Sequence, residues 1–293
     1  MTPHLRSAAA MLLCALAATA AASPADAARA RSVTERVFAF GPGGTLVIDS
    51  QNGRIVVEAW ERPEVRVQIT REVRANGEDQ ARSLLRQLTA DVSVTPRRIR
   101  IQSVYPKREK VVGIWDLIGR GVRSLNIHYY VQVPRQTLLD LSTDNGEIRV
   151  RGTQGQSELM TTNGDIDVIS VRGPVEAHTT NGEIRMARVE GSAEAATTNG
   201  GVAAEMTSLP AGGVLDLRTT NGNVQLTLPH DIRAVVEANT TNGRVTINYK
   251  MTMQGAITSK SIRGTIGGGG ARIKLETANG NVDVGPPRAR AKR

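Results

Sequence analysis

Acidic side chains recur at one position of an internal repeat, six residues before the glycine of successive Asn-Gly pairs. Carboxylate oxygens in such a row suit the binding of hard divalent cations or of a cationic partner. The same residues on the solvent side of a strand do no more than keep a sheet soluble, and the sequence leaves both interpretations open. The six carboxylates are Asp140, Glu158, Glu176, Glu194, Asp216 and Glu237, and Lys274 holds this position in a seventh copy.

Paired carboxylates also occur in retaining glycosidases, where the two carboxyl groups lie about 5–5.5 Å apart beside the sugar. A carbohydrate-active β-helix enzyme, a glycosidase or a lyase, is therefore the alternative function. A regular row gives neighbouring carboxyls the same surroundings, so nothing separates their pKa values. Only Trp60 and Trp115 supply indole rings for stacking on a sugar. We therefore expect no enzyme and no catalytic residue.

Cofactor and metal chemistry find little support in the composition. The one cysteine, Cys14, lies in the first 27 residues, and His128, His178 and His230 are not spaced with one another as metal ligands usually are. The glycines lack phosphate-loop spacing, and no nucleophile-elbow motif is present. We expect no cofactor and no dedicated metal site.

The Asn-Gly pairs that follow the acidic residues mark the structural repeat. Most are preceded by two threonines, and the step from Gly146 to Gly164, Gly182 and Gly200 is 18 residues each time, followed by steps of 22, 21 and 37. Apolar residues alternate with polar ones on both sides of each pair, as in Ile166-Asp167-Val168. Alternation with a period of two predicts strands with one buried face.

Two architectures fit these strands. Asn-Gly is the strongest short hairpin signal, which favours an antiparallel β meander. In a β-solenoid, by contrast, equivalent Thr and Asn residues of successive coils lie about 4.8 Å apart and hydrogen-bond along the stack. The near identity of seven corners favours this second form. We predict an all-β, single-chain β-solenoid, similar to a parallel β-helix, with coils of about 18 residues. Its acidic residues then form one outward row, with neighbours that repel by roughly 0.9 kcal/mol in bulk water.

The region before the repeats, residues 33–135, is expected to hold further strands and one short helix at about 77–88 that covers the first coils. The repeat region, residues 136–285, continues from it. An insertion at 107–124 is apolar in its middle and basic at both ends. It either folds back on the solenoid or contacts a membrane surface or a protein partner. Its apolar contact residues are Ile114, Trp115, Leu117 and Ile118.

The two ends of the chain indicate where the protein resides. Arg6, the apolar stretch 8–22 and Ala25-Asp26-Ala27 predict a signal peptide in residues 1–27, cleaved after Ala27. The apolar stretch is shorter than the roughly 20 residues of a membrane-spanning helix, so we expect no transmembrane segment in the mature chain. We expect an exported protein that is periplasmic, on the cell surface or secreted. The net charge of +9 and the basic, disordered tail at 286–293 favour an envelope polymer, a membrane surface or a surface protein as partner. No recognition motif indicates nucleic acid.

Several motifs in order resemble a known family. They are Leu46-x-Ile48 followed by Asn52-Gly53, the segment Trp60-x-x-Pro63, the pair Val133-Pro134, and the serial Thr-Thr-Asn-Gly repeats. Together, over about residues 40–285, they resemble the bacterial "putative adhesin" family of DUF4097 type, which is built from β-strand repeats. The resemblance implies a β-helix-like envelope or surface protein and brings no catalytic residues. The irregular steps after Gly200 leave the coil register open there.

From the residues and the resemblance together we predict a non-catalytic, exported binding or scaffolding protein of the cell envelope or surface. The repeated polar faces of a solenoid offer a partner many weak contacts along one surface.

Overall fold

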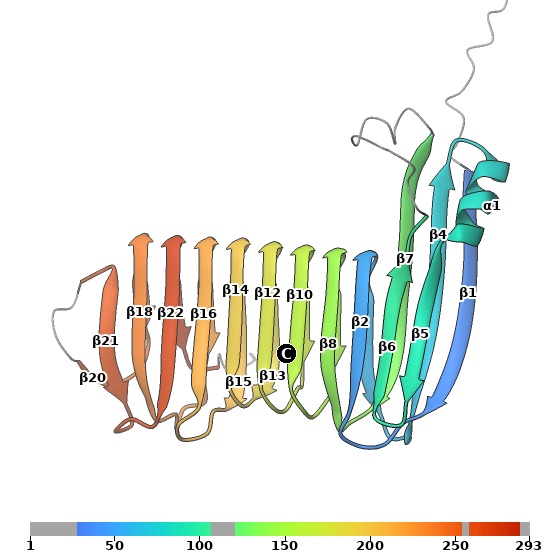
Figure 1. Ribbon diagram of the computed structural model, residues 1–293. Coiled ribbons are helices and arrows are strands. Elements are labelled where there is room, and N and C mark those ends of the chain that lie inside the picture. Colours follow the sequence, from blue (N-terminus) through green and yellow to red (C-terminus); the bar gives the residue numbers. More distant parts are fainter. Residues whose placement is uncertain (1–27, 107–120, 254–257, 288–293) are drawn as a thin grey trace, which may run out of the picture.

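Two long, mostly parallel β-sheets face each other in the computed structural model, which describes residues 28–106, 121–253 and 258–287 (Figure 1). Sheet A has 11 strands and sheet B has 12. The expected signal peptide, the basic tail and the apolar residues Ile114, Trp115, Leu117 and Ile118 lie outside the described residues. No helix in the described ranges is both long and apolar enough to cross a membrane.

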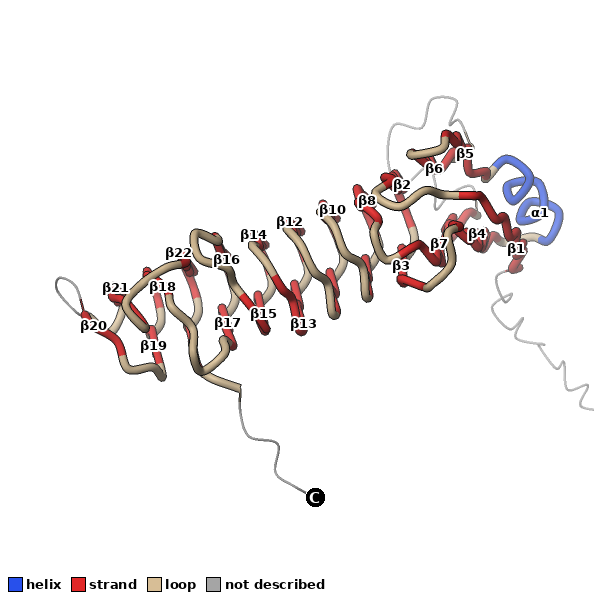
Figure 2. The backbone as a smooth tube through the Cα atoms, turned by 90° about the horizontal axis from the view of Figure 1, so that it is seen from below, coloured by secondary structure: helices blue, strands red, loops and turns tan. Residues whose placement is uncertain are grey.

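Each coil contributes one strand to each sheet, and Figure 2 shows the chain passing from one sheet to the other and back. Successive coils pair in parallel, so the β-solenoid is confirmed and the antiparallel meander is wrong for the repeats. The regular coils, each with its sheet B strand first, are β8 (Thr137–Asn145) with β9 (Ile148–Arg151), β10 (Ser157–Asn163) with β11 (Ile166–Ile169), β12 (Val175–Asn181) with β13 (Ile184–Glu190), β14 (Ala193–Asn199) with β15 (Val202–Ser208), and β16 (Val214–Asn221) with β17 (Val224–Thr227).

The Asn-Gly corners join like residues of neighbouring coils. Asn163 donates its side-chain amide to the side-chain oxygen of Asn145 at 2.8 Å, and the hydroxyl of Thr161 donates to the carbonyl of Gly146 at 3.0 Å. A Cβ atom on Gly164 would lie 2.0 Å from that same carbonyl oxygen. Because the corners stack this closely, the position requires glycine whatever its backbone angles.

Small and aliphatic side chains fill the space between the two sheets. In the regular coils, Leu159, Ala177 and Ala195 are fully buried. The bulkiest buried side chains, Tyr129 and Phe40, belong to the N-terminal end. The narrow core follows from this choice of residues, because facing sheets can approach closely only where the side chains between them are small.

The coils do not stack in chain order at either end of the solenoid. The coil of β2 (Gly44–Asn52) and β3 (Ile55–Trp60) lies between β8–β9 and the coil of β6 (Arg98–Val104) and β7 (Val122–Pro134). At the other end, β22 (Ala271–Asn279) and β23 (Val282–Gly285) lie between β16–β17 and the coil of β18 (Ala234–Asn242) and β19 (Val245–Ile247). The 37-residue step in the repeat reflects this insertion.

Antiparallel strands close both ends. At the N-terminal end, β4 (Glu64–Ala75) pairs with β7, β1 (Ala28–Ala39) with β4, and β5 (Thr89–Thr95) with β6. The single described helix, α1 (Glu78–Gln87), packs on β1 and β4 and buries Ala81, so it covers this end beyond the first coils (Figure 1). At the C-terminal end, β21 (Ser261–Ile266) pairs with β18, and β20 (Met251–Met253) pairs with β21.

Candidate functional site

Five carboxylates form a continuous row on the outer face of sheet B, and we call this row the acidic column. Each is the Cα partner of the next across adjacent parallel strands, so the side chains repeat at the strand spacing of about 4.8 Å. The acidic column consists of Asp140, Glu158, Glu176, Glu194 and Asp216.

The sixth predicted member, Glu237, does not follow Asp216. Because β22 inserts between β16 and β18, Lys274 is the register partner of both Asp216 and Glu237. The prediction of six adjoining carboxylates is therefore wrong at its last step. A lysine separates the two acids, which removes one like-charge contact and ends the acidic column with a positive charge.

The next outward row supplies side-chain partners to only part of the acidic column. The Nε2 atom of His178 lies 3.1 Å from Oε1 of Glu176, and Nε of Arg218 donates to Oδ1 of Asp216 at 2.6 Å. Asp140, Glu158 and Glu194 have no side-chain hydrogen bond or ion pair to any residue that the structure describes. Asp140 and Glu158 are therefore free to meet a partner, whereas Glu194 interacts electrostatically with Arg218.

A metal ion has no prepared site along this row. Within the described ranges, no three His, Asp or Glu side chains converge where one ion could bind them together. The outward direction of neighbouring strands explains this, because their carboxylates stand side by side and do not surround a point. Cation binding along the acidic column stays a prediction.

The outer face of sheet A arranges its charges in the opposite way. Asp167 lies in register between Arg149 and Arg185, with its Oδ2 atom 3.0 Å from Nη2 of Arg149 and its Oδ1 atom 3.6 Å from Nη1 of Arg185. Glu147 and Asp165 complete the group, at 2.5 Å from Arg149 and 3.2 Å from Arg185. The hydrogen bond from Arg149 to Asp167 raises the pKa of the guanidinium. The charges of this group are paired with one another, so these residues offer a partner less than the acidic column does.

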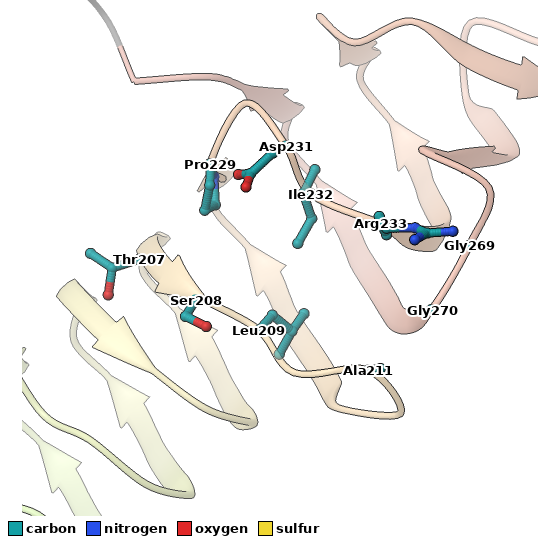
Figure 3. Close-up of a pocket in the computed structure, with 10 residues that line it drawn as sticks. All are labelled: Thr207, Ser208, Leu209, Ala211, Pro229, Asp231, Ile232, Arg233, Gly269 and Gly270. Carbon is teal, nitrogen blue, oxygen red and sulfur yellow. The ribbon is translucent and has the colours of Figure 1, made fainter.

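A cavity of about 480 Å³ opens where the repeat lengthens from 18 to 22 residues. Figure 3 shows residues 207–209 on one side of it and residues 231–233 on the other. Asp231 is the one carboxylate among its lining residues, and Arg233 donates from Nε to the carbonyl of Gly267 at 2.9 Å. The lining therefore lacks the two carboxyl groups on which glycosidase chemistry depends.

Trp60, the tryptophan within the described residues, has its ring engaged by neighbouring groups. The guanidinium carbons of Arg62 and Arg66 lie 5.2 and 5.3 Å from the ring centre of Trp60, and the indole N–H donates to the carbonyl of Glu64. Trp115 lies outside the described residues.

A second cleft, which the sequence did not reveal, lies on the outer side of sheet A at the N-terminal end. Its lining brings together Arg29, Arg31, Arg54, Glu72 and His128 from four separate segments of the chain. No repeat or motif connects these residues, and the alternating arginines at the start of β1 were the one available hint. We call this the step cleft and return to it below.

Comparisons with known proteins give a family and several distant structures. Residues 169–285 match the family model Toastrack DUF4097. A "putative cell adhesion protein" from Clostridium sporogenes is 9% identical with a TM-score of 0.36, and the match covers 87% of this chain and 100% of that one. A "putative adhesin" from Bacteroides fragilis is 11% identical with a TM-score of 0.37, covering 87% and 97%. A "putative lipid binding protein" from Parabacteroides distasonis is 10% identical with a TM-score of 0.26, covering 86% and 96%. No curated protein matches the chain.

These structural similarities are too low to carry an argument about function. The family match runs from the end of β11 to β23, and it covers the coils in which the repeat step changes from 18 to 22, 21 and 37 residues. The resemblance to the DUF4097 family is confirmed over residues 169–285, which match the Toastrack DUF4097 model.

Proposed function

We propose that this protein is an exported, non-catalytic binding or scaffolding protein of the bacterial cell envelope, and that it docks a partner along the acidic column. The observation that carries the proposal is the register of five carboxylates on one open face, two of which, Asp140 and Glu158, have no counter-charge in the described residues. Such a row is complementary to a partner that presents positive charges at short intervals.

The distribution of charge along the chain supports this choice of partner. Residues 136–228, which form the regular coils, contain twelve Asp and Glu against six Lys and Arg, although the whole protein has a net charge of +9. The coils are thus an acidic stretch in a basic protein. Several weak contacts in a row add up, because each further contact forms at high effective concentration.

Export rests on residues 1–27, whose composition is that of a signal peptide. Mass spectrometry of the protein isolated from cell envelopes should find Ala28 as its first residue. An N-terminus at Met1 would contradict the cleavage.

Binding to isolated envelope fractions tests the acidic column. The double reversal Glu176→Lys/Glu194→Lys should weaken cosedimentation with envelopes by at least about tenfold, since it replaces two attractions by two repulsions. A matched control reverses two acids on the outer face of sheet A, Glu205→Lys/Asp283→Lys, and should bind like the unaltered protein. Equal binding by both variants and the unaltered protein would contradict the proposal.

A calcium titration distinguishes the two ways in which a row of carboxylates can bind a partner, through a bridging divalent cation or by direct contact with positive charges. If divalent cations bridge the protein to its partner, calcium should raise the melting temperature of the unaltered protein and leave that of Glu176→Gln/Glu194→Gln unchanged. The absence of any shift would exclude the cation and leave direct contact with a cationic partner.

A further inference from the structure

The step cleft exists because the strands at the N-terminal end are taller than the coils beside them. β3 begins at Ile55, opposite Tyr129, whereas β7 begins at Val122 and therefore extends past the corner at Gly53 and Arg54. β4 and β1 extend with β7, and Figure 1 shows all three rising above the neighbouring coils. The outer face of these strands forms a wall and the stacked corners form a floor, which enclose about 590 Å³ between them.

Positive charge exceeds negative charge in this cleft. Its lining contains three arginines and the two carboxylates Glu72 and Glu147. Glu72 is occupied by Nη2 of Arg29 at 2.6 Å and by Nε of Arg74 at 3.1 Å, and its side chain is only 10% exposed. These two arginines hold the pKa of Glu72 below its usual range although burial opposes them.

One arginine of the cleft has no ion-pair partner among the described residues. Glu147 takes the Nε atom of Arg54 at 2.8 Å. Arg31, the register partner of Glu72 on β1, has no hydrogen bond or ion pair to the described part of the chain. Its guanidinium is exposed, always charged and shaped to bind two oxygens of one anion.

His128 supplies a second donor with a defined direction. The backbone N–H of Arg54 donates to its Nδ1 atom at 3.0 Å, so the neutral ring carries its proton on Nε2. Burial lowers the pKa of His128, and the charges of Arg54 and Arg31 act in the same direction while Glu72 opposes them. The ring is therefore a neutral hydrogen-bond donor at pH 7.

We propose that the step cleft binds an oxyanion, a phosphate or sulfate group, between the guanidinium of Arg31 and the Nε2–H group of His128. The arrangement provides a full positive charge, a neutral donor and a floor of polar corners. The site is independent of the acidic column, which lies on the other sheet and carries the opposite charge.

Binding should become tighter as the pH falls. Protonation of the ring places a proton on Nδ1 and so breaks the hydrogen bond from the Arg54 N–H. A bound anion still favours the imidazolium, so it raises the pKa of His128, and by linkage the protonated protein binds the anion more strongly. The charged groups that face His128 are Arg31 on β1, Glu72 on β4 and Arg54 at the corner before β3, with Arg29 and Glu147 further along the lining. His128 is the one group among them whose ordinary pKa lies between about 5.5 and 7.5.

Calorimetric titration with sulfate tests the site, because sulfate itself does not titrate in this range. We expect Arg31→Gln to weaken sulfate binding at least about tenfold. The matched control is Arg36→Gln on the same strand, which is exposed and does not line the cleft, and it should change binding less than about twofold. Equal losses in both variants, or no binding by the unaltered protein, would overturn the proposal.

The variant His128→Asn isolates the histidine. Its side-chain oxygen can still accept the N–H of Arg54, so the fold is retained, which a thermal melt would verify. The unaltered protein should bind sulfate several-fold more tightly at pH 5.5 than at pH 7.5, and His128→Asn should show no such change. An undiminished pH dependence in the variant would contradict the role of His128.

Two further probes identify the source of the anion. Displacement of sulfate by glycerol phosphate, without binding to phosphatidylglycerol vesicles, supports a soluble or polymer-borne group. Cosedimentation with phosphatidylglycerol vesicles, but not with phosphatidylcholine vesicles, supports a lipid headgroup. Either result must be lost in Arg31→Gln, and a result that persists in this variant argues against the cleft.

Discussion

The regular coils and the N-terminal end share the same two sheets but hold them together differently. In the coils, one contact is repeated many times, as when the Asn181 amide donates to Asn163 at 2.8 Å and the Asn199 amide donates to Asn181 at the same distance. At the N-terminal end each contact occurs once. Tyr129, for example, shares a hydrogen bond of 2.7 Å with Ser103, which in turn contacts Ser50 at 3.0 Å.

The difference decides where chemically distinct groups occur. Like residues stacked on like give every side chain of a column the same neighbours, so the coils keep their charges on the outside and their core aliphatic. Where the repetition stops, side chains meet unlike neighbours. Glu72 is nearly buried there, His128 is half-buried, and burial raises the pKa of Tyr129 well above its usual range. The regular coils thus favour an extended binding face, whereas the end where the repeat stops favours a local binding site.

The largest expected effect comes from breaking a coil corner. In Gly182→Ala, the new Cβ would lie 2.0 Å from the carbonyl oxygen of Gly164, and backbone on both sides prevents relief. We expect a loss of more than about 4 kcal/mol in the free energy of unfolding, measured by urea denaturation. The matched change at the N-terminal end is Gly41→Ala, where the nearest atom to a Cβ is 3.8 Å away. It should cost less than about 1 kcal/mol, and similar losses in both variants would refute the steric account.

A smaller effect is expected from neutralising a buried charge at the N-terminal end. Glu72→Gln leaves Arg29 and Arg74 without their carboxylate and should cost about 1–2 kcal/mol at pH 7. Its coil counterpart is Asp165→Asn, whose side chain is 43% exposed and should contribute less than about 0.5 kcal/mol.

The variant Glu72→Gln should also have a distinct pH dependence. Because the pKa of Glu72 is lowered in the folded protein, the unfolded chain takes up the proton first as the pH falls below the ordinary value of 4.5. The unaltered protein should therefore lose its advantage over Glu72→Gln as the pH falls from 4.5 through the lower folded value. A stability difference that is constant from pH 7 to pH 3 would contradict this assignment.

The smallest effect is expected on the acidic column and has the opposite sign. Glu176→Gln/Glu194→Gln removes a like-charge contact between adjacent strands and should raise the melting temperature by about 1–3 °C at low ionic strength. The gain should vanish in about 0.5 M salt, where charges at this spacing are screened. A decrease in melting temperature would indicate that these carboxylates stabilise the coil.

The sequence predicts the regular coils better than it predicts the two ends of the solenoid. The corner spacing predicted the solenoid and its coil length, because a constant period fixes which residues become neighbours. The helix was expected at about 77–88 and is observed at Glu78–Gln87.

The order of the last coils could not be obtained from the period, since a repeat gives the shape of a coil and not its place in the stack. The charge of Lys274 was the available sign, because it suits a position between Asp216 and Glu237. The step cleft could not be predicted from the sequence for another reason. Arg31, Glu72 and His128 come from three strands, two of them antiparallel to the third, and only the tertiary pairing brings them together.

The insertion of β22–β23 between two earlier coils means that the stack cannot be completed in the order in which the chain is synthesised or threaded across a membrane. Until residues 271–285 arrive, β16 and β18 each present an unpaired backbone edge toward the same empty slot. This final segment then inserts between the two coils and pairs with the strands of both. A chain that ends before Ala271 would keep two unpaired strand edges, and such edges pair with strands of other molecules and lead to aggregation. The stack of coils is therefore complete only when β22 and β23 are in place.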